Sequence, residues 1–324
     1  MRKYISNFLS AKESSSYSAF FRIILASFGL VYLFAVRHSV IELFGEYGFT
    51  GWELGRLKLI KHLPHISDLA RLLNKVGLSA DQTVYLLFYV FALSLFALLL
   101  GFGTRFAAIV AWCMSFFLYY AGISTINGMG SVFHIGLFYL MIMPSNRTFS
   151  LDAYFFKRVK SLEVKSFTRK LLQFQLALLY LSTGLEKSVG GQWWNGEAIW
   201  RSLNMPIYRH FDMSWTCNYP TILTIVGIST LVMEIGYIIF VWIKKIRAVW
   251  LAIIMTMHLF IGLFMNLEFF AAIMVLVNIG AFGPEVYKDL TAYKLKKRKL
   301  ADEKTPVLTG LDPIPVLQNQ QTPN

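Results

Sequence analysis

Long apolar stretches, separated by short polar segments, make up most of this 324-residue chain. The run from Tyr85 to Leu100 contains no charged residue and is nearly long enough to cross a bilayer, which takes about 20 helical residues. Blocks of the same kind recur and predict an all-α fold, a polytopic membrane helical bundle of about eight spans. The expected spans are residues 18–37, 83–100, 105–123, 130–143, 170–186, 219–243, 248–265 and 268–282.

Shorter amphipathic segments accompany the apolar blocks. Near the N-terminus Tyr4 and Phe8 lie at helical spacing among basic residues, which is typical of an interfacial helix on an anionic leaflet. Residues 38–81 contain apolar positions that suit further interfacial helices, at Ile66, Leu69, Leu72, Leu73 and Val76. The predicted domains are an interfacial amphipathic helix at 1–17, a transmembrane domain at 18–285, and a basic and then disordered cytoplasmic tail at 286–324.

The positive charge of the chain indicates its orientation in the membrane. The formal net charge is +13, but the Lys and Arg residues gather between apolar blocks, at 157–170, 244–247 and 294–299. Basic loops mark the cytoplasmic ends of spans, so we expect both termini to be cytoplasmic and the segment containing Lys187 to be extracytoplasmic. The same residues favour contact with anionic lipid headgroups. Membrane lipids, and not nucleic acid, are the partners that this charge predicts.

Four ionisable residues fall inside or at the end of predicted spans, at Lys187, His134, Glu234 and His258. A charge at the centre of a lipid-facing helix costs at least about 2.5–3.5 kcal/mol, so such residues are candidates for function. Each also has a structural interpretation. Glu234 and the two histidines can be hydrogen-bonded packing residues, and Lys187 can extend to the outer interface.

The remaining polar residues do not suggest a metal site. The chain has two cysteines, Cys113 in an apolar run and Cys217 in a polar connection. It contains neither a C-x-x-C pattern nor a Cys/His cluster, which are the usual ligand arrangements of structural zinc. We therefore expect no metal cofactor.

A motif spanning the end of the fifth predicted span is more specific. A small residue followed by Gly184, then Lys187, then Trp193-Trp194-Asn195-Gly196 resembles the signature of the vitamin K-dependent γ-carboxylase-like proteins. These form the horizontally transferred transmembrane (HTTM) domain family. The likeness covers roughly residues 16–285 and corresponds to a short form of the family.

The resemblance implies a chemistry and a location. In the carboxylases the lysine of this motif deprotonates reduced vitamin K, and by motif position that residue is Lys187. It implies reduced vitamin K or another quinol as cofactor, and a lyase in which the oxygenated quinol anion removes a γ-proton from Glu before carbon dioxide adds. His134, His258 and Glu234 would provide catalytic support. The bacterial cell membrane is the expected location.

The motif also implies a pocket for the quinone or substrate, formed by Gly184, Trp193, Trp194 and Gly196. The tryptophans have an alternative interpretation as an interfacial belt. The state of Lys187 should distinguish the possible functions, because a charged ammonium cannot accept a proton.

A second function is compatible with the same sequence. From its length after the eighth predicted span, we expect no counterpart of the large lumenal region with which animal carboxylases grip a propeptide. Without such a region the chain could be a non-carboxylating membrane factor for the maturation or export of a secreted protein or peptide. A neutral, buried Lys187 favours the enzyme, whereas an exposed Lys187 paired with the adjacent Glu186 favours the second function.

Overall fold

The computed structural model describes residues 11–59, 62–156 and 162–304. Its fold is all-α, as the sequence predicts, and each of the eight predicted spans corresponds to one long helix. These helices are α2 (Ser16–Val36), α6 (Ala80–Leu100), α7 (Thr104–Tyr119), α8 (Gly128–Ile142), α10 (Phe167–Val189), α13 (Pro220–Phe240), α14 (Arg247–Met265) and α15 (Glu268–Lys304).

Five of these helices, α2, α6, α13, α14 and α15, are long and apolar enough to cross a membrane. The other three differ in length or polarity. Helices α7 and α8 have only 16 and 15 residues, and α10 has 23 residues but includes charged residues at both ends. The membrane helical bundle is therefore confirmed, and the count of eight spans stays a prediction.

The ends of the long helices follow local sequence signals. Helix α6 begins with a capping box, in which Ser79 and Gln82 bond each other's backbone N–H groups. It ends at Gly101, whose φ of +70° is easily adopted only by glycine. Helix α13 begins at Pro220. Proline lacks a backbone N–H, but this costs no hydrogen bond here because N–H groups in the first turn of a helix have no intrahelical acceptor.

Short helices connect the long ones, and three of them lie in the segment predicted to contain interfacial helices. In α5 of that segment Ile66 is buried, while Leu72 is exposed. The short elements are α3 (Val40–Phe44), α4 (Gly51–Lys58), α5 (Ile66–Asn74), η1 (Ile123–Thr125), α9 (Leu151–Phe156), α11 (Gly191–Trp194), α12 (Glu197–Asn204) and η2 (Ser214–Asn218).

Two local features differ from the expectation. Strand β1 (Lys12–Ser14) pairs antiparallel with β2 (Glu163–Lys165), with Lys12 opposite Lys165, where the sequence predicted the end of an amphipathic helix. The rest of that predicted helix, residues 1–10, lies outside the described residues. Helix α15 continues through Pro284 to Lys304, so the first part of the predicted tail is helical. The predicted disorder from 305 onward also lies outside the described residues.

A buried ion network joins three distant segments near β1. The Arg169 guanidinium contacts Glu13 and Glu285, and Lys170 Nζ lies 2.7 Å from Glu285 Oε1. Arg169 also donates to the carbonyl of Ala281 at 2.7 Å. A strand is favoured at Lys12–Ser14 because its alternation turns Glu13 inward to Arg169 while its neighbours stay exposed.

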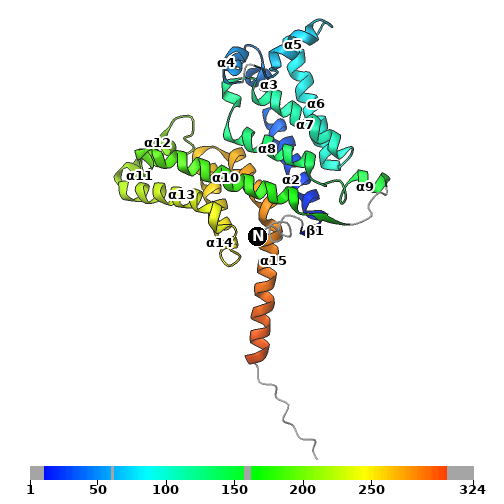
Figure 1. Ribbon diagram of the computed structural model, residues 1–324. Coiled ribbons are helices and arrows are strands. Elements are labelled where there is room, and N and C mark those ends of the chain that lie inside the picture. Colours follow the sequence, from blue (N-terminus) through cyan, green and yellow to red (C-terminus); the bar gives the residue numbers. More distant parts are fainter. Residues whose placement is uncertain (1–10, 60–61, 157–161, 305–324) are drawn as a thin grey trace, which may run out of the picture.

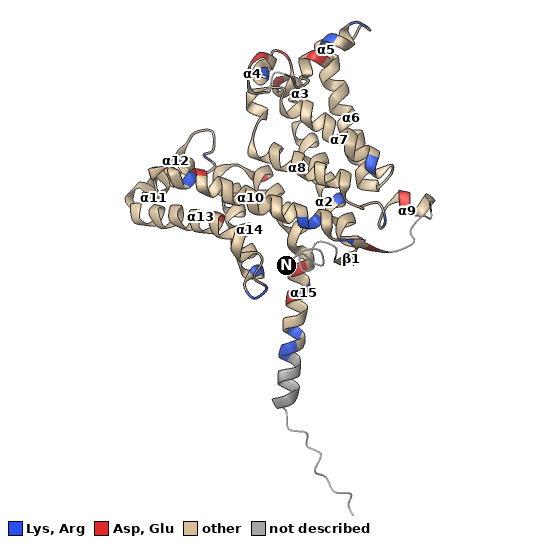
Figure 2. Ribbon diagram, in the orientation of Figure 1, with Lys and Arg blue, Asp and Glu red and all other residues tan. Residues whose placement is uncertain are grey.

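The helices form two groups on either side of α15 (Figure 1). Helices α10–α14 lie on one side, α2–α8 lie on the other, and α15 packs against both α14 and α2. Lys and Arg residues occur at the turn between α13 and α14 and along the projecting part of α15, toward the same end of the molecule (Figure 2). This arrangement agrees with the predicted placement of both segments on one side of the membrane.

Candidate functional site

Lys187 and Glu234 form an ion pair between α10 and α13. The Lys187 ammonium contacts the Glu234 carboxylate, and the side chains are 28% and 6% exposed, respectively. The helices approach closely because Gly184 lies one turn before Lys187: a Cβ on Gly184 would be only 3.0 Å from the Glu234 Cβ. The sequence indicated Glu186 as a partner, but the carboxylate that pairs with Lys187 comes from another helix.

The Trp-x-x-Gly segment covers this ion pair. Trp193 presents its ring to the Lys187 ammonium, with 5.2 Å between Nζ and the ring centroid, which is within the range of a cation–π contact. Gly196 has a φ of +81° and lies directly against the backbone of α13 near Thr224. A side chain at Gly196 would push α11 and α12 away from α13, so Gly196 helps to place Trp193 over the pair.

One carboxylate oxygen of the pair has an unmet hydrogen-bonding capacity. Glu234 Oε1 contacts Lys187, whereas Oε2 is buried and has no hydrogen-bond partner among the described residues. Buried polar atoms are normally hydrogen-bonded, so an exception in a polar cluster suggests an interaction with something that the chain does not provide. Glu234 Oε2 is therefore the atom of this site best suited to a ligand or a mobile proton.

A second polar layer lies one to two turns deeper in the bundle. Tyr180 precedes Gly184 and Lys187 on the same face of α10, and its hydroxyl lies 2.8 Å from His258 Nε2 on α14. Asn278 on α15 donates to the Tyr180 hydroxyl at 3.0 Å and accepts from the Tyr237 hydroxyl at 2.6 Å. The Tyr180 and Tyr237 rings stack with centroids 4.2 Å apart. This network fixes α10, α13, α14 and α15 relative to one another.

The predicted site residues do not all come together. Lys187, Glu234, Gly184 and Trp193 lie in direct contact or one turn apart, and His258 lies in the deeper layer through Tyr180. His134 instead belongs to the other group of helices. Its Nδ1 lies 2.7 Å from Ser115 Oγ on α7, and its ring stacks on Trp112 at 4.8 Å. The catalytic role proposed for His134 stays a prediction, with contacts that suit packing.

Trp194 lies beside Ile228 and Val232, two exposed residues of α13. Its indole N–H donates to the carbonyl of Ser188 at 2.8 Å, and its ring lines an apolar pocket of about 270 Å³. Leu231 and Ile235 also line this pocket and flank Glu234 in the sequence of α13. An apolar space therefore lies on the helix that carries the buried carboxylate.

Three residues of the site were not identified from the sequence: Tyr180, Tyr237 and Asn278. Asn278 is a single amide within the apolar run of residues 271–282, which is a signal of the same kind as Glu234. Tyr180 lies four residues before Gly184 and so shares its helix face. The tyrosines gave a weaker signal, because tyrosine is frequent in membrane helices and at their ends.

The apolar helices and the polar cluster between them define an integral membrane protein with a charged site inside a helical bundle. The chain belongs to the HTTM domain family, whose model matches residues 70–284, more than half of its length. The matched region contains the whole of the Lys187–Glu234 site and the deeper layer. No curated protein and no solved structure matches the chain.

Proposed function

We propose that the chain is a membrane enzyme in which the Lys187–Glu234 pair accepts a proton from a lipid-soluble acid such as a quinol. The observation that carries the proposal is the buried Glu234 carboxylate, with one oxygen on Lys187 and the other without a partner among the described residues. The γ-carboxylase-like motif at Gly184, Lys187 and Trp193 supports the same chemistry. Carboxylation of a protein or peptide Glu is the reaction that this resemblance implies.

The ion pair supplies a way to make Lys187 basic. An ammonium cannot accept a proton, but transfer of its proton to Glu234 leaves a neutral amine beside a neutral carboxylic acid. This transfer removes two charges from a poorly solvated place, where separated charges are disfavoured. The neutral amine of Lys187 then takes a proton from the lipid-soluble acid, while Glu234 stays protonated. This leaves the anion of the lipid-soluble acid beside a newly formed ammonium. The proton moves from the acid to Lys187 Nζ, and no other bond changes.

The residues around the pair fit a flat, apolar acid. Glu234 Oε2 can accept a hydrogen bond from a hydroxyl group, and the Trp193 ring can stack on an aromatic one. The pocket lined by Trp194, Leu231 and Ile235 offers apolar surface for a hydrocarbon tail. A bound quinol would supply the acidic hydroxyl and, after reaction with oxygen, the strong base that the resemblance implies.

In this proposal His258 is a positioning residue. It contacts Tyr180 and not the pair, and Tyr180 shares a helix face with Gly184 and Lys187. The hydrogen bonds of Tyr180 to His258 and Asn278 set the rotation of α10 about its axis. This rotation determines whether Lys187 points at Glu234.

The alternative function, a non-carboxylating factor for the maturation or export of a secreted protein or peptide, rests on the same contact. A lysine that pairs stably with a carboxylate stays charged and can serve to hold two helices together. In that case the bundle presents its extracytoplasmic surface to a partner and the pair performs no chemistry.

The substitution Lys187→Arg distinguishes the two functions. Arginine keeps the positive charge and can bind Glu234, but its guanidinium is not deprotonated in proteins. We would purify the full chain in lipid nanodiscs and add reduced quinone, labelled carbon dioxide and peptides that contain Glu. Quinone epoxide and fixed label are scored separately. If the chain is an enzyme, Lys187→Arg should lower the yields of quinone epoxide and of fixed label at least about 100-fold, which is the typical contribution of a general base.

Lys244→Arg is the matched control, because Lys244 is exposed in the turn between α13 and α14. This control should keep the activity of the wild type. An active Lys187→Arg protein would exclude the proton-transfer role of Lys187. Failure of the wild type to form either product with any quinone tested would favour the maturation or export function.

A further inference from the structure

A pocket far from Lys187 lies where the turn between α6 and α7 meets the segment that follows α8. It has a volume of about 630 Å³. Arg105, at the start of α7, and Arg147, between α8 and α9, both line it. Both side chains are exposed. The pocket thus brings together two cationic groups from segments about 40 residues apart.

Asp152 provides the one carboxylate among the described residues of the pocket wall, and this carboxylate is already engaged. Asp152 Oδ1 accepts from the backbone N–H of Gly103 at 2.7 Å, and Oδ2 accepts from the backbone N–H and the hydroxyl of Thr104 at 2.9 and 2.7 Å. The carboxylate therefore occupies the N-terminus of α7 and stabilises it. This contact also fixes the position of the 146–156 segment against the turn, so the pocket is held by hydrogen bonds.

A third guanidinium lies behind the pocket wall. Arg22 of α2 is fully buried and contacts the carbonyl of Phe149, which lies in the segment between Arg147 and Asp152. Its Nε and Nη1 atoms have no hydrogen-bond partner among the described residues. Among the described residues at the pocket and behind it, the charges of Arg22, Arg105 and Arg147 outnumber that of Asp152, so the local charge is positive, which favours an anion at the pocket.

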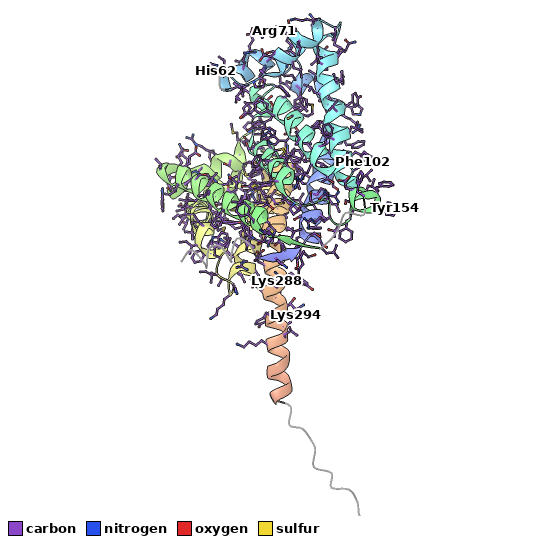
Figure 3. All side chains as sticks on the ribbon, turned by 45° about the vertical axis from the view of Figure 1, so that its right-hand side comes forward. His62, Arg71, Phe102, Tyr154, Lys288 and Lys294 are labelled. Carbon is purple, nitrogen blue, oxygen red and sulfur yellow. The ribbon has the colours of Figure 1, made fainter. Side chains whose placement is uncertain are left out.

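The rim of the pocket is aromatic. Phe106 and Phe156 line it and are 74% and 59% exposed, and neighbouring Phe102 and Tyr154 are 56% and 74% exposed. Figure 3 shows Phe102 and Tyr154 projecting on the same side of the molecule. Exposed aromatic rings beside cationic groups are typical of the membrane interface, where the rings meet acyl chains and the cations meet headgroups.

We infer that this pocket binds the phosphate headgroup of an anionic phospholipid between Arg105 and Arg147. Guanidinium groups bind phosphate through paired, charge-assisted hydrogen bonds, which a weakly basic or neutral surface cannot provide. The aromatic rim favours a lipid over a soluble phosphate compound, because the acyl chains of a lipid can pack on the exposed rings. The site is separate from the Lys187–Glu234 pair and does not depend on the reaction proposed for it.

Lipid binding can be measured on the purified full chain by native mass spectrometry. The protein in detergent is titrated with phosphatidylglycerol and, separately, with phosphatidylcholine. We expect the wild type to retain phosphatidylglycerol preferentially, and the double variant Arg105→Gln/Arg147→Gln to bind it at least about tenfold more weakly. The double variant Arg105→Lys/Arg147→Lys should retain part of the preference. Binding of phosphatidylcholine should change little in either variant.

The matched control is Lys244→Gln/Lys245→Gln, which removes two exposed cations from the turn between α13 and α14. It should keep the affinity of the wild type for phosphatidylglycerol. An equal loss of affinity in this control would mean that general surface charge attracts the lipid, and would overturn the assignment of the pocket as the lipid site. Equal retention of the two lipids by the wild type would also overturn it.

Glycerol 3-phosphate distinguishes a lipid from a soluble phosphate compound. Displacement of bound phosphatidylglycerol by micromolar glycerol 3-phosphate would contradict the lipid assignment, whereas resistance to millimolar concentrations supports it. If the double Gln variant does not fold, Arg105→Gln alone decides the question, because the exposed Arg105 side chain makes no described contact with the core. A single variant with wild-type lipid preference would then exclude Arg105 as a ligand and overturn the site.

Discussion

The Lys187 ammonium contacts the Glu234 carboxylate from the neighbouring helix, at a level where Gly184 leaves no side chain between α10 and α13. The two partners are unequal, because the Lys187 side chain is 28% exposed and that of Glu234 only 6%. The lysine can reach water if it loses its partner, whereas the glutamate cannot. This asymmetry leads to the first prediction.

Removal of the lysine should destabilise the protein more than removal of the glutamate charge. Lys187→Met leaves an isolated carboxylate in a buried place, and a broken buried pair costs about 3–5 kcal/mol. Glu234→Gln leaves an ammonium that can be solvated and should cost less. The apparent free energy of unfolding, measured in nanodiscs, tests this order.

The double variant Lys187→Met/Glu234→Leu provides the control for that measurement. It removes both charges, so it should recover part of the stability that Lys187→Met loses. Additive losses in the double variant would mean that the two side chains do not interact.

Gly184 should tolerate no larger residue. A Cβ at this position would lie 2.8 Å from Ile235 Cγ1 and 3.1 Å from the Ile235 backbone nitrogen, so Gly184→Ala must separate α10 from α13. We expect a loss of about 1–3 kcal/mol in stability, the usual cost of overpacking, and a larger loss of any activity that needs the ion pair. In the matched control Gly191→Ala the added Cβ meets nothing within 4 Å, and both quantities should stay unchanged. Similar losses in the two variants would exclude a packing role specific to Gly184.

Much of the fold could be predicted from the sequence because the lipid environment dictates its pattern. A span needs about 20 apolar residues, and each predicted span corresponds to one helix. Strand β1 was missed because the reason for it lies far away in the sequence: Glu13 turns inward to Arg169 only after α10 has packed. The extension of α15 past Pro284 was missed because proline usually ends a helix.

The site was harder to predict than the fold. The motif identified Lys187, and a lone acidic residue in an apolar run identified Glu234, but nothing in the sequence paired them. Glu186 was the obvious neighbour, yet adjacent residues on a helix point about 100° apart and do not face each other. The choice of Glu234 depends on how α10 and α13 are rotated about their axes, which is set by Gly184 and by the deeper layer at Tyr180.

His65 should make the stability of the 38–81 region dependent on pH. Its Nδ1 accepts from the backbone N–H of Ser67 at 3.1 Å, and its Nε2 lies 3.0 Å from the carbonyl of Tyr120. Burial lowers the pKa of His65 below its ordinary value of 6.5, because the neutral ring is favoured in the folded protein. The stabilisation is therefore complete above pH 6.5 and is lost as the pH falls through the lower, folded pKa.

Hydrogen exchange of the α5 amides, corrected for the intrinsic effect of pH, measures this loss. We expect faster opening of α5 as the pH falls below about 6.5 in the wild type. In His65→Asn the side-chain oxygen can still accept from Ser67, but it does not titrate in this range. The opening of α5 in this variant should be nearly independent of pH. An unchanged pH dependence would show that another group is responsible.

The predicted topology can be tested with the cysteine that the chain already has outside its apolar helices. Cys217 is exposed and lies in the connection between α12 and α13, on the extracytoplasmic side if the basic segments are cytoplasmic. In a Cys113→Ala background it should react with a membrane-impermeant maleimide added to intact cells.

A cysteine introduced as Lys244→Cys, with Cys217→Ala, should react only after the membrane is opened, because the turn between α13 and α14 lies at the other end of α13. Gly191→Cys, with both native cysteines replaced by Ala, should react with the maleimide in intact cells as Cys217 does, since α11 follows the outer end of α10. Labelling of both ends of α13 from one side would mean that α13 does not span the membrane, and the predicted extracytoplasmic placement of the segment that contains Lys187 would be wrong.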